Sequence, residues 1–121
     1  MPMVRVSNGL PEFDNSHFVR VNGTTITKEG PHVIMCSGSW IDRINWGISQ
    51  RIYVNGVSVP LLYQASESGS RRVADLETEY YRALTSFAVV QLKVGDVISA
   101  NQTGIYDNTI SRTPIIYRYE P

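Results

Sequence analysis

The chain has 121 residues, of which 42% are hydrophobic and 18% are charged. This length is typical of one domain, and the charged fraction lies below the roughly 25% of an average domain. Eleven Lys and Arg residues balance eleven Asp and Glu residues, so the formal net charge is zero. Such a chain has no long-range field to attract phosphate backbones or anionic lipids. We therefore expect neither nucleic acid nor a membrane as its partner.

The cysteine count and the hydropathy pattern indicate a chain that is made in a reducing compartment. Cys36 is the sole cysteine, so no disulfide can form within the chain and the fold must depend on its core. The first residues carry no basic segment followed by an apolar run, as a signal peptide would. No apolar run approaches the roughly 20 residues that cross a bilayer. We expect synthesis in the cytoplasm, which still allows release by cell lysis.

The first 16 residues predict an extended arm rather than a folded domain. Prolines and Asn-Gly and Asp-Asn pairs break this segment repeatedly and leave one short strand over residues 3–6. We therefore place the arm at residues 1–16 and the globular domain at residues 17–121.

Two Asn-Gly pairs predict tight β-hairpins. Both central positions of a type I′ turn need positive φ, which makes Asn-Gly the strongest two-residue hairpin signal. The pair at 22–23 separates predicted strands 18–21 and 24–27, and the pair at 55–56 separates predicted strands 48–54 and 57–63.

The middle of the chain contains one clear strand and one ambiguous region. Residues 32–40 are rich in Val, Ile and Trp and alternate with period two, as a strand does. The polar sequence at 66–72 predicts a loop tip and the most mobile segment. Residues 75–84 fit two interpretations, an irregular stretch that leads into a strand or a short helix capped by Asp75.

The C-terminal third predicts strands throughout. Residues 83–91 form the clearest long strand, and residues 97–100 follow it across a Gly-Asp turn. A short strand is expected at 109–112 and a last one at 115–119. Eight or nine short strands with turn signals about every ten residues predict an all-β fold, an antiparallel sandwich or barrel.

The sequence offers little catalytic chemistry. A metal site of the cupin type needs two or three histidines and a carboxylate, and only His17 and His32 are present. Cys36 lies within an apolar strand, where a thiol is usually an inert core residue. No Gly-x-Ser-x-Gly elbow marks a nucleophilic serine. We predict no metal, no cofactor and no catalytic residue, and so no enzyme.

One group of carboxylates requires a choice between two interpretations. Asp75, Glu77 and Glu79 alternate beside Tyr80 and Tyr81, which could form a glycosidase pair or the rim of a sugar site. A solvated strand edge explains the same pattern more simply, and we favour it.

The order of three segments resembles a known family. ITKEGPHVIMCSGSW (26–40), RIYVNGVSVP (51–60) and LKVGDVISAN (92–101) resemble the tumour-necrosis-factor-like jelly roll. This superfamily includes the globular head of the complement first component and many bacteriophage virion proteins. The resemblance runs from about residue 24 to residue 119. Residues 66–81 align with nothing in the family, so no pocket or receptor residue can be transferred.

The resemblance implies a jelly roll that assembles as a threefold trimer. In relatives the last strand contributes aromatic side chains to the trimer axis. The matching positions are Tyr117 and Tyr119, which share a strand face with Ile115, while Ile116 and Arg118 point the other way. The alternative is that the tyrosines only fill the core.

From this resemblance we expect a virion protein, made in the host cytoplasm, that is a homotrimer without enzymatic activity. The first hypothesis is a phage head decoration (cement) protein that binds the major capsid protein or another virion protein. The short chain favours this over a fibre tip, which usually carries an anchoring segment before its jelly roll. The arm would contact the capsid through Val4, Arg5, Val6 and Phe13.

Two other functions stay open at this point. A tail-fibre head would bind a glycan or host receptor through Arg71, Arg72, Tyr80 and Tyr81, since aromatic rings stack on sugars. A small enzyme of cupin type is the third hypothesis, and metal analysis of the purified protein would test it.

Overall fold

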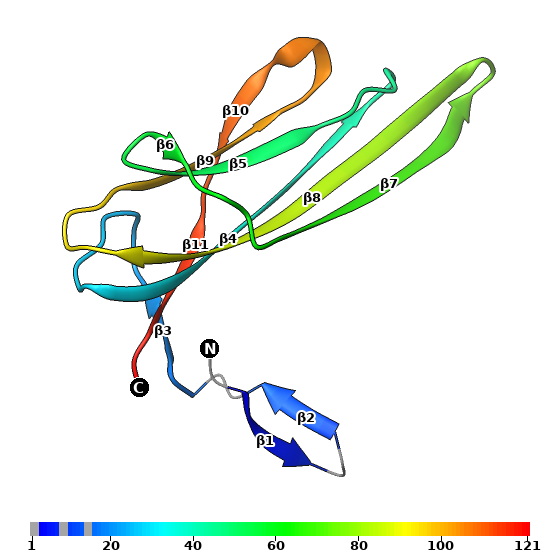
Figure 1. Cartoon of the computed structure of the whole chain (residues 1–121). Coiled ribbons are helices and arrows are strands. Elements are labelled where there is room, and N and C mark those ends of the chain that lie inside the picture. The colour runs from blue at the N-terminus through cyan, green and yellow to red at the C-terminus, as the bar shows by residue number, and fades with distance from the viewer. Residues whose placement is uncertain (1–2, 8–9, 14–15) are drawn as a thin grey trace.

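The computed structural model of the chain describes residues 3–7, 10–13 and 16–121, with side chains from Ser16 onward. These residues form strands and one short 3-10 helix (Figure 1). The elements are β1 (Met3–Ser7), β2 (Leu10–Phe13), β3 (Phe18–Val21), β4 (Gly30–Asp42), β5 (Ser49–Val54), β6 (Val57–Ser58), β7 (Tyr63–Ala74), β8 (Glu77–Leu92), β9 (Ile98–Thr103), η1 (Ile105–Asp107), β10 (Thr109–Arg112) and β11 (Ile115–Tyr119).

Two antiparallel sheets form the body of the protein. The five-stranded sheet has the order β3-β11-β4-β8-β7, and the four-stranded sheet has the order β10-β9-β5-β6. The chain passes repeatedly between the sheets, and β11 returns to lie between β3 and β4. The all-β, antiparallel prediction is confirmed.

The core lies between the two sheets. Ile34 and Ile116 come from the five-stranded sheet and Ile52 and Ile98 from the four-stranded sheet, and each is at most 2% exposed. All four belong to one hydrophobic cluster. The two sheets therefore pack face to face, as in a β-sandwich.

The turn between β5 and β6 is the predicted Asn-Gly turn. Asn55 and Gly56 both have positive φ (51° and 80°), as a type I′ turn requires. The Asn55 side chain also donates to the Asp96 carboxylate (2.9 Å) and accepts from the Val97 N–H (2.9 Å). Asp96 accepts from the Lys93 N–H (2.9 Å), and these bonds lower the pKa of Asp96. The two turns at this end of the sandwich are thereby tied together.

The prediction of a hairpin at Asn22-Gly23 is wrong. After β3 the chain crosses to the other sheet, where Thr25 forms an isolated bridge with Val97. The Ile26 N–H donates to the Asp96 carbonyl (2.8 Å), and the Ile98 N–H donates to the Thr24 carbonyl (2.8 Å). These residues pair with the start of β9 instead of returning along β3.

The region from 66 to 84 differs most from the sequence-based expectation. The expected loop tip at 66–72 is part of strand β7, and the ambiguous residues 75–84 are a tight turn followed by β8. Leu76, at the turn, has φ of 62° and is 97% exposed. Figure 1 shows β7 and β8 as one long hairpin that projects from the sandwich.

The arm also contains more structure than expected. β1 covers the predicted strand, but β2 pairs with it antiparallel, so the segment is a two-stranded hairpin. These strands form a sheet of their own, apart from the two sheets of the sandwich.

Candidate functional site

The two faces of β11 differ as the alternation predicts. Ile116 is 1% exposed and belongs to the core cluster. Ile115, Tyr117 and Tyr119 are half-buried on the opposite face of the strand. The interpretation that the tyrosines fill the core is therefore wrong for this chain: they lie on the outer face of the five-stranded sheet.

Strand register aligns β11 with apolar side chains of its neighbours. Ile115 lies opposite Met35 and Tyr117 opposite Val33, while Tyr119 lies opposite Phe18. Residues that are directly opposite each other share a sheet face. Extending this register through β8 and β7 adds three more positions. The resulting surface, called here the outer patch, consists of Phe18, Val33, Met35, Tyr63, Phe87, Val89, Ile115, Tyr117 and Tyr119.

The aromatic rings of the outer patch contact their neighbours along the sheet. Tyr119 packs against Phe18 with ring centroids 5.7 Å apart, and Tyr63 packs against Phe87 at 6.0 Å. The Arg20 guanidinium lies 5.7 Å from the centre of the Tyr117 ring. The four-stranded sheet covers the other face of the five-stranded sheet and leaves the outer patch uncovered. Val89 is therefore 41% exposed and Tyr63 58% exposed.

Polar contacts fix the C-terminal end of β11. Glu120 accepts a hydrogen bond from Lys28 Nζ (2.7 Å) and another from Arg118 Nη2 (3.0 Å). Its N–H donates to the His17 carbonyl (2.7 Å). The Lys28 and Arg118 contacts hold the pKa of Glu120 below its usual range. The last strand, with its two tyrosines, is thus held in register next to β3.

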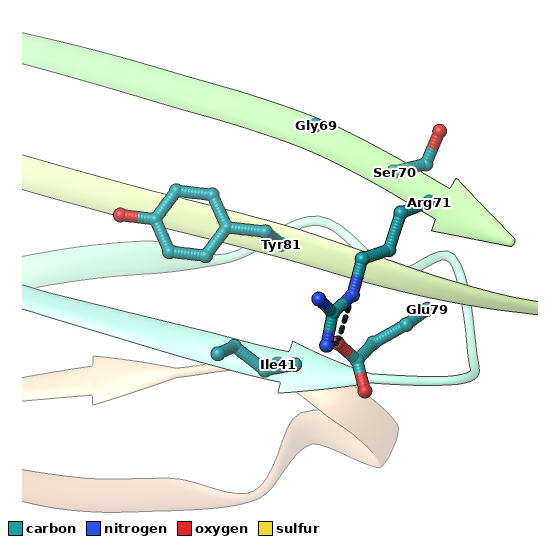
Figure 2. A pocket seen from close by; sticks show the side chains of 6 residues that line it. All are labelled: Ile41, Gly69, Ser70, Arg71, Glu79 and Tyr81. Atoms are coloured by element: carbon teal, nitrogen blue, oxygen red, sulfur yellow. Dashed lines mark hydrogen bonds and ion pairs between the residues drawn. The ribbon is translucent and has the colours of Figure 1, made fainter. Parts of the chain in front are cut away.

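The second group of predicted site residues is split between two faces of the β7–β8 hairpin. Arg71 and Tyr81 line a shallow pocket of about 390 Å³ (Figure 2). Its lining residues are Ile41, Gly69, Ser70, Arg71, Glu79 and Tyr81. Arg72 and Tyr80 occupy the alternate strand positions and face the other side of the sheet.

An ion pair forms one wall of this pocket. Arg71 Nη2 lies 3.2 Å from Glu79 Oε1, with Arg71 75% and Glu79 28% exposed. The dashed lines in Figure 2 mark this pair, directly opposite across β7 and β8. The carboxylates at 77 and 79 form surface ion pairs with Arg43 and Arg71. They lie on β8, between β4 and β7, and so not on the edge strand expected from the sequence.

The predicted capsid contacts of the arm lie outside the residues whose side chains the structure describes. Val4, Arg5, Val6 and Phe13 belong to β1 and β2, but the structure describes no side chain before Ser16.

Sequence reasoning missed a polar cluster between the sheets, in which Cys36, Gln50 and Ser86 are buried and Gln64 is exposed. Ser86 donates to Gln50 Oε1 (2.7 Å) and accepts from Gln64 Nε2 (2.9 Å), and Gln50 Nε2 donates to Cys36 Sγ (3.2 Å). Burial raises the pKa of the Cys36 thiol, with the positive charge of Arg112 opposing part of the shift. Cys36 is therefore a protonated core residue. Glutamine at a core position of a strand is the only signal that could have revealed the cluster.

His32 supplies a pH-dependent element in the core. It is 1% exposed, and its Nδ1 donates to the Gly30 carbonyl (2.7 Å), while Nε2 is buried without a hydrogen-bond partner in the described part of the chain. Desolvation by burial lowers the pKa of His32; the Gly30 hydrogen bond opposes this shift and the charge of Arg118 adds to it.

This shift predicts lower stability in mild acid. The unfolded chain binds a proton at His32 near pH 6.5, and the folded chain binds it only at lower pH. The free energy of unfolding should therefore fall as the pH drops from 7.5 to 5.5, by at most about 1.4 kcal/mol per pH unit. Urea titrations at both pH values measure this. A His32→Gln variant should lose most of the decline, and an equal decline in that variant would contradict the assignment.

The described residues offer neither a metal site nor a membrane-spanning helix, and the comparisons with known proteins found no match. Among the described residues, no group of three or more His, Cys, Asp and Glu side chains could hold a metal ion. In the same residues no helix has the length and apolarity that crossing a membrane requires. No protein-family model matches the chain, and the searches of curated proteins and of solved structures also found no match.

Proposed function

We propose that this chain is a non-enzymatic virion structural protein, a phage head decoration protein that binds the capsid shell as a trimer with a jelly-roll fold. One observation carries the proposal: the outer patch leaves Tyr117, Tyr119 and Ile115 on a half-buried sheet face that the second sheet does not cover. The patch combines aromatic and aliphatic side chains, the composition of the buried centre of protein interfaces.

The occupant we propose for the outer patch is the same patch of two further copies. The sequence resemblance supports the threefold arrangement, and the face of β11 that carries the tyrosines agrees with it. Charge also favours self-association, since the chain has no net charge and identical copies do not repel one another over a distance.

Decoration would act by mass action. A protein that binds only the assembled, expanded shell stabilises that state in proportion to its occupancy. The N-terminal hairpin is suited to the capsid contact, because β1 and β2 form a sheet of their own and belong to neither sheet of the sandwich.

Deletion of residues 1–14 tests this assignment. We expect affinity for purified capsid shells to fall by roughly tenfold or more, equivalent to at least about 1.4 kcal/mol, while the trimer stays folded. Co-sedimentation with shells measures the affinity, and circular dichroism with sedimentation velocity checks the fold and the trimer. Unchanged affinity would refute the role of the arm. No binding of the full-length chain to any shell or virion component would refute the function.

A second candidate function is the glycan- or receptor-binding head of a tail fibre. The shallow pocket supports it, because it brings an aromatic side chain, Tyr81, beside the Arg71–Glu79 ion pair. A glycan array with the multivalent protein would test this function. Binding that is lost in Tyr81→Ala would favour it over decoration.

A further inference from the structure

The β7 edge is the long open edge of the described sheets. β7 has 12 residues and lies at one end of the five-stranded sheet. The other edge strands are short: β3 and β10 have four residues each and β6 has two. An edge strand presents a row of unpaired N–H and C=O groups to any strand that approaches.

The sequence of β7 carries only part of the usual protection against such pairing. Natural edges are blocked by charged side chains, above all lysine, by proline or by a bulge. β7 contains neither lysine nor proline, and its charges, Glu67, Arg71 and Arg72, are of both signs. The one shift in the pairing register of β7 with β8 lies near the end of the strand, between Arg72 and Ala74, and leaves the rest of the edge regular.

All side chains from Ser66 to Ala74 are exposed. This part of β7 therefore buries no side chain. Beyond Asp42, which pairs with Tyr80, β4 no longer supports the hairpin, so its end is a two-stranded ribbon of the kind that is marginal without a further strand.

The charges along β7 are self-complementary in one antiparallel register. We propose that two copies of this chain pair antiparallel along β7, with a twofold axis through Gly69. In this register Glu67 of each copy lies opposite Arg71 of the other, and Ser68 lies opposite Ser70. The two five-stranded sheets become one continuous sheet.

Symmetry and charge select this register over its neighbours. The twofold axis that relates two antiparallel edge strands is perpendicular to the sheet. The outer faces of the two copies therefore lie on the same side of the joined sheet. Under this symmetry the pairing register can change only in steps of two residues. A twofold axis through Ser68 would place Glu67 opposite Gly69, and one through Ser70 would place it opposite Val73. Opposite charges face each other only when the axis passes through Gly69.

The groups that would form the new ion pairs are in place. Glu67 is exposed and forms no ion pair with the described residues, while Arg71 contacts Glu79 through Nε and Nη2. A guanidinium has five N–H donors, so Arg71 can bind Glu79 of its own chain and Glu67 of the second copy together. This pairing does not depend on the proposed trimer, since β7 and β11 lie at different positions in the sheet.

A cysteine scan of β7 tests the register. In Gly69→Cys the two new thiols face each other across the axis, where Cα atoms of opposite residues are about 4.5–5.5 Å apart, within the range of a disulfide. A Cβ at Gly69 meets no atom within 4 Å, so the substitution fits the strand. Ser66→Cys is the matched control, because its thiols would lie about 20 Å apart in this register. The native Cys36 is buried, so in both variants the introduced cysteine is the thiol available for cross-linking.

Mild oxidation of the full chain at low concentration should give a dimer band for Gly69→Cys and little for Ser66→Cys on a non-reducing gel. Adding Glu67→Lys to Gly69→Cys places like charges opposite each other twice and should reduce the cross-link severalfold. Equal cross-linking of Gly69→Cys and Ser66→Cys, or none in either, would overturn the proposal. Because the gel dissociates non-covalent trimers, this result is separate from the test of the trimer.

Discussion

Replacing Ile116 with alanine should lower the free energy of unfolding by about 2–5 kcal/mol, the usual cost of removing a fully buried isoleucine side chain. Ile116 is 1% exposed and packs in the core cluster between the sheets. β11 pairs with both β3 and β4, so the surrounding backbone has little freedom to close the cavity. A urea titration at fixed protein concentration measures the loss.

Ile115 is the matched control, one residue away on the other face of the same strand. It is half-buried and belongs to the outer patch. Ile115→Ala should cost the fold about 1 kcal/mol or less, but it should weaken self-association, which sedimentation velocity detects. If Ile115→Ala destabilises the fold as much as Ile116→Ala and leaves the assembly unchanged, the assignment of the two faces is wrong.

Replacing Gly104 with alanine should cost about 1–3 kcal/mol through overpacking. A Cβ at this position would lie 2.7–2.9 Å from three atoms of the Trp40 indole. The indole is rigid and half-buried, so either the ring or the backbone before η1 must move. A shift in tryptophan fluorescence should accompany the loss of stability.

Two variants make this prediction specific. In Gly47→Ala the new Cβ meets no atom within 4 Å, so its stability should stay within about 0.5 kcal/mol of the parent. In a Trp40→Phe background the smaller ring leaves room for the methyl group, so the cost of Gly104→Ala should shrink in a double-mutant cycle. Independent, additive effects would contradict the close contact.

Local chemistry explains which elements the sequence could predict. The Asn55-Gly56 turn was predictable because positive φ at both positions is a property of those two residues. The same residue pair at 22–23 led to a wrong hairpin prediction, because the residues that follow it form hydrogen bonds with the start of β9 in the other sheet. These partners are distant in the sequence, so the local pattern does not reveal them. Residues 66–72 of β7 were mistaken for a loop because their side chains are polar or absent and are exposed on both faces, so no alternation marks them.

The outer patch was predictable only in part. Alternation along 115–119 places Tyr117 and Tyr119 on one face without any knowledge of neighbours. Val33 and Val89 lie on the same sheet face as these tyrosines because of the register of β11 with β4 and of β4 with β8. Register depends on pairing between residues far apart in the chain, and one sequence does not specify it. For the same reason the pocket joins Tyr81 to Ile41, while Tyr80 lies on the opposite face.

The central claim is that identical copies cover the outer patch. Sedimentation equilibrium of the purified chain, whose mass is 13.6 kDa, tests it directly. We predict the mass of three chains, or of a multiple of three where the β7 edges also pair between trimers. Tyr117→Arg should abolish the trimer, while Val57→Arg, an exposed position on β6 of the other sheet, should preserve it. A parent protein that sediments as one or two chains at high concentration would contradict the account.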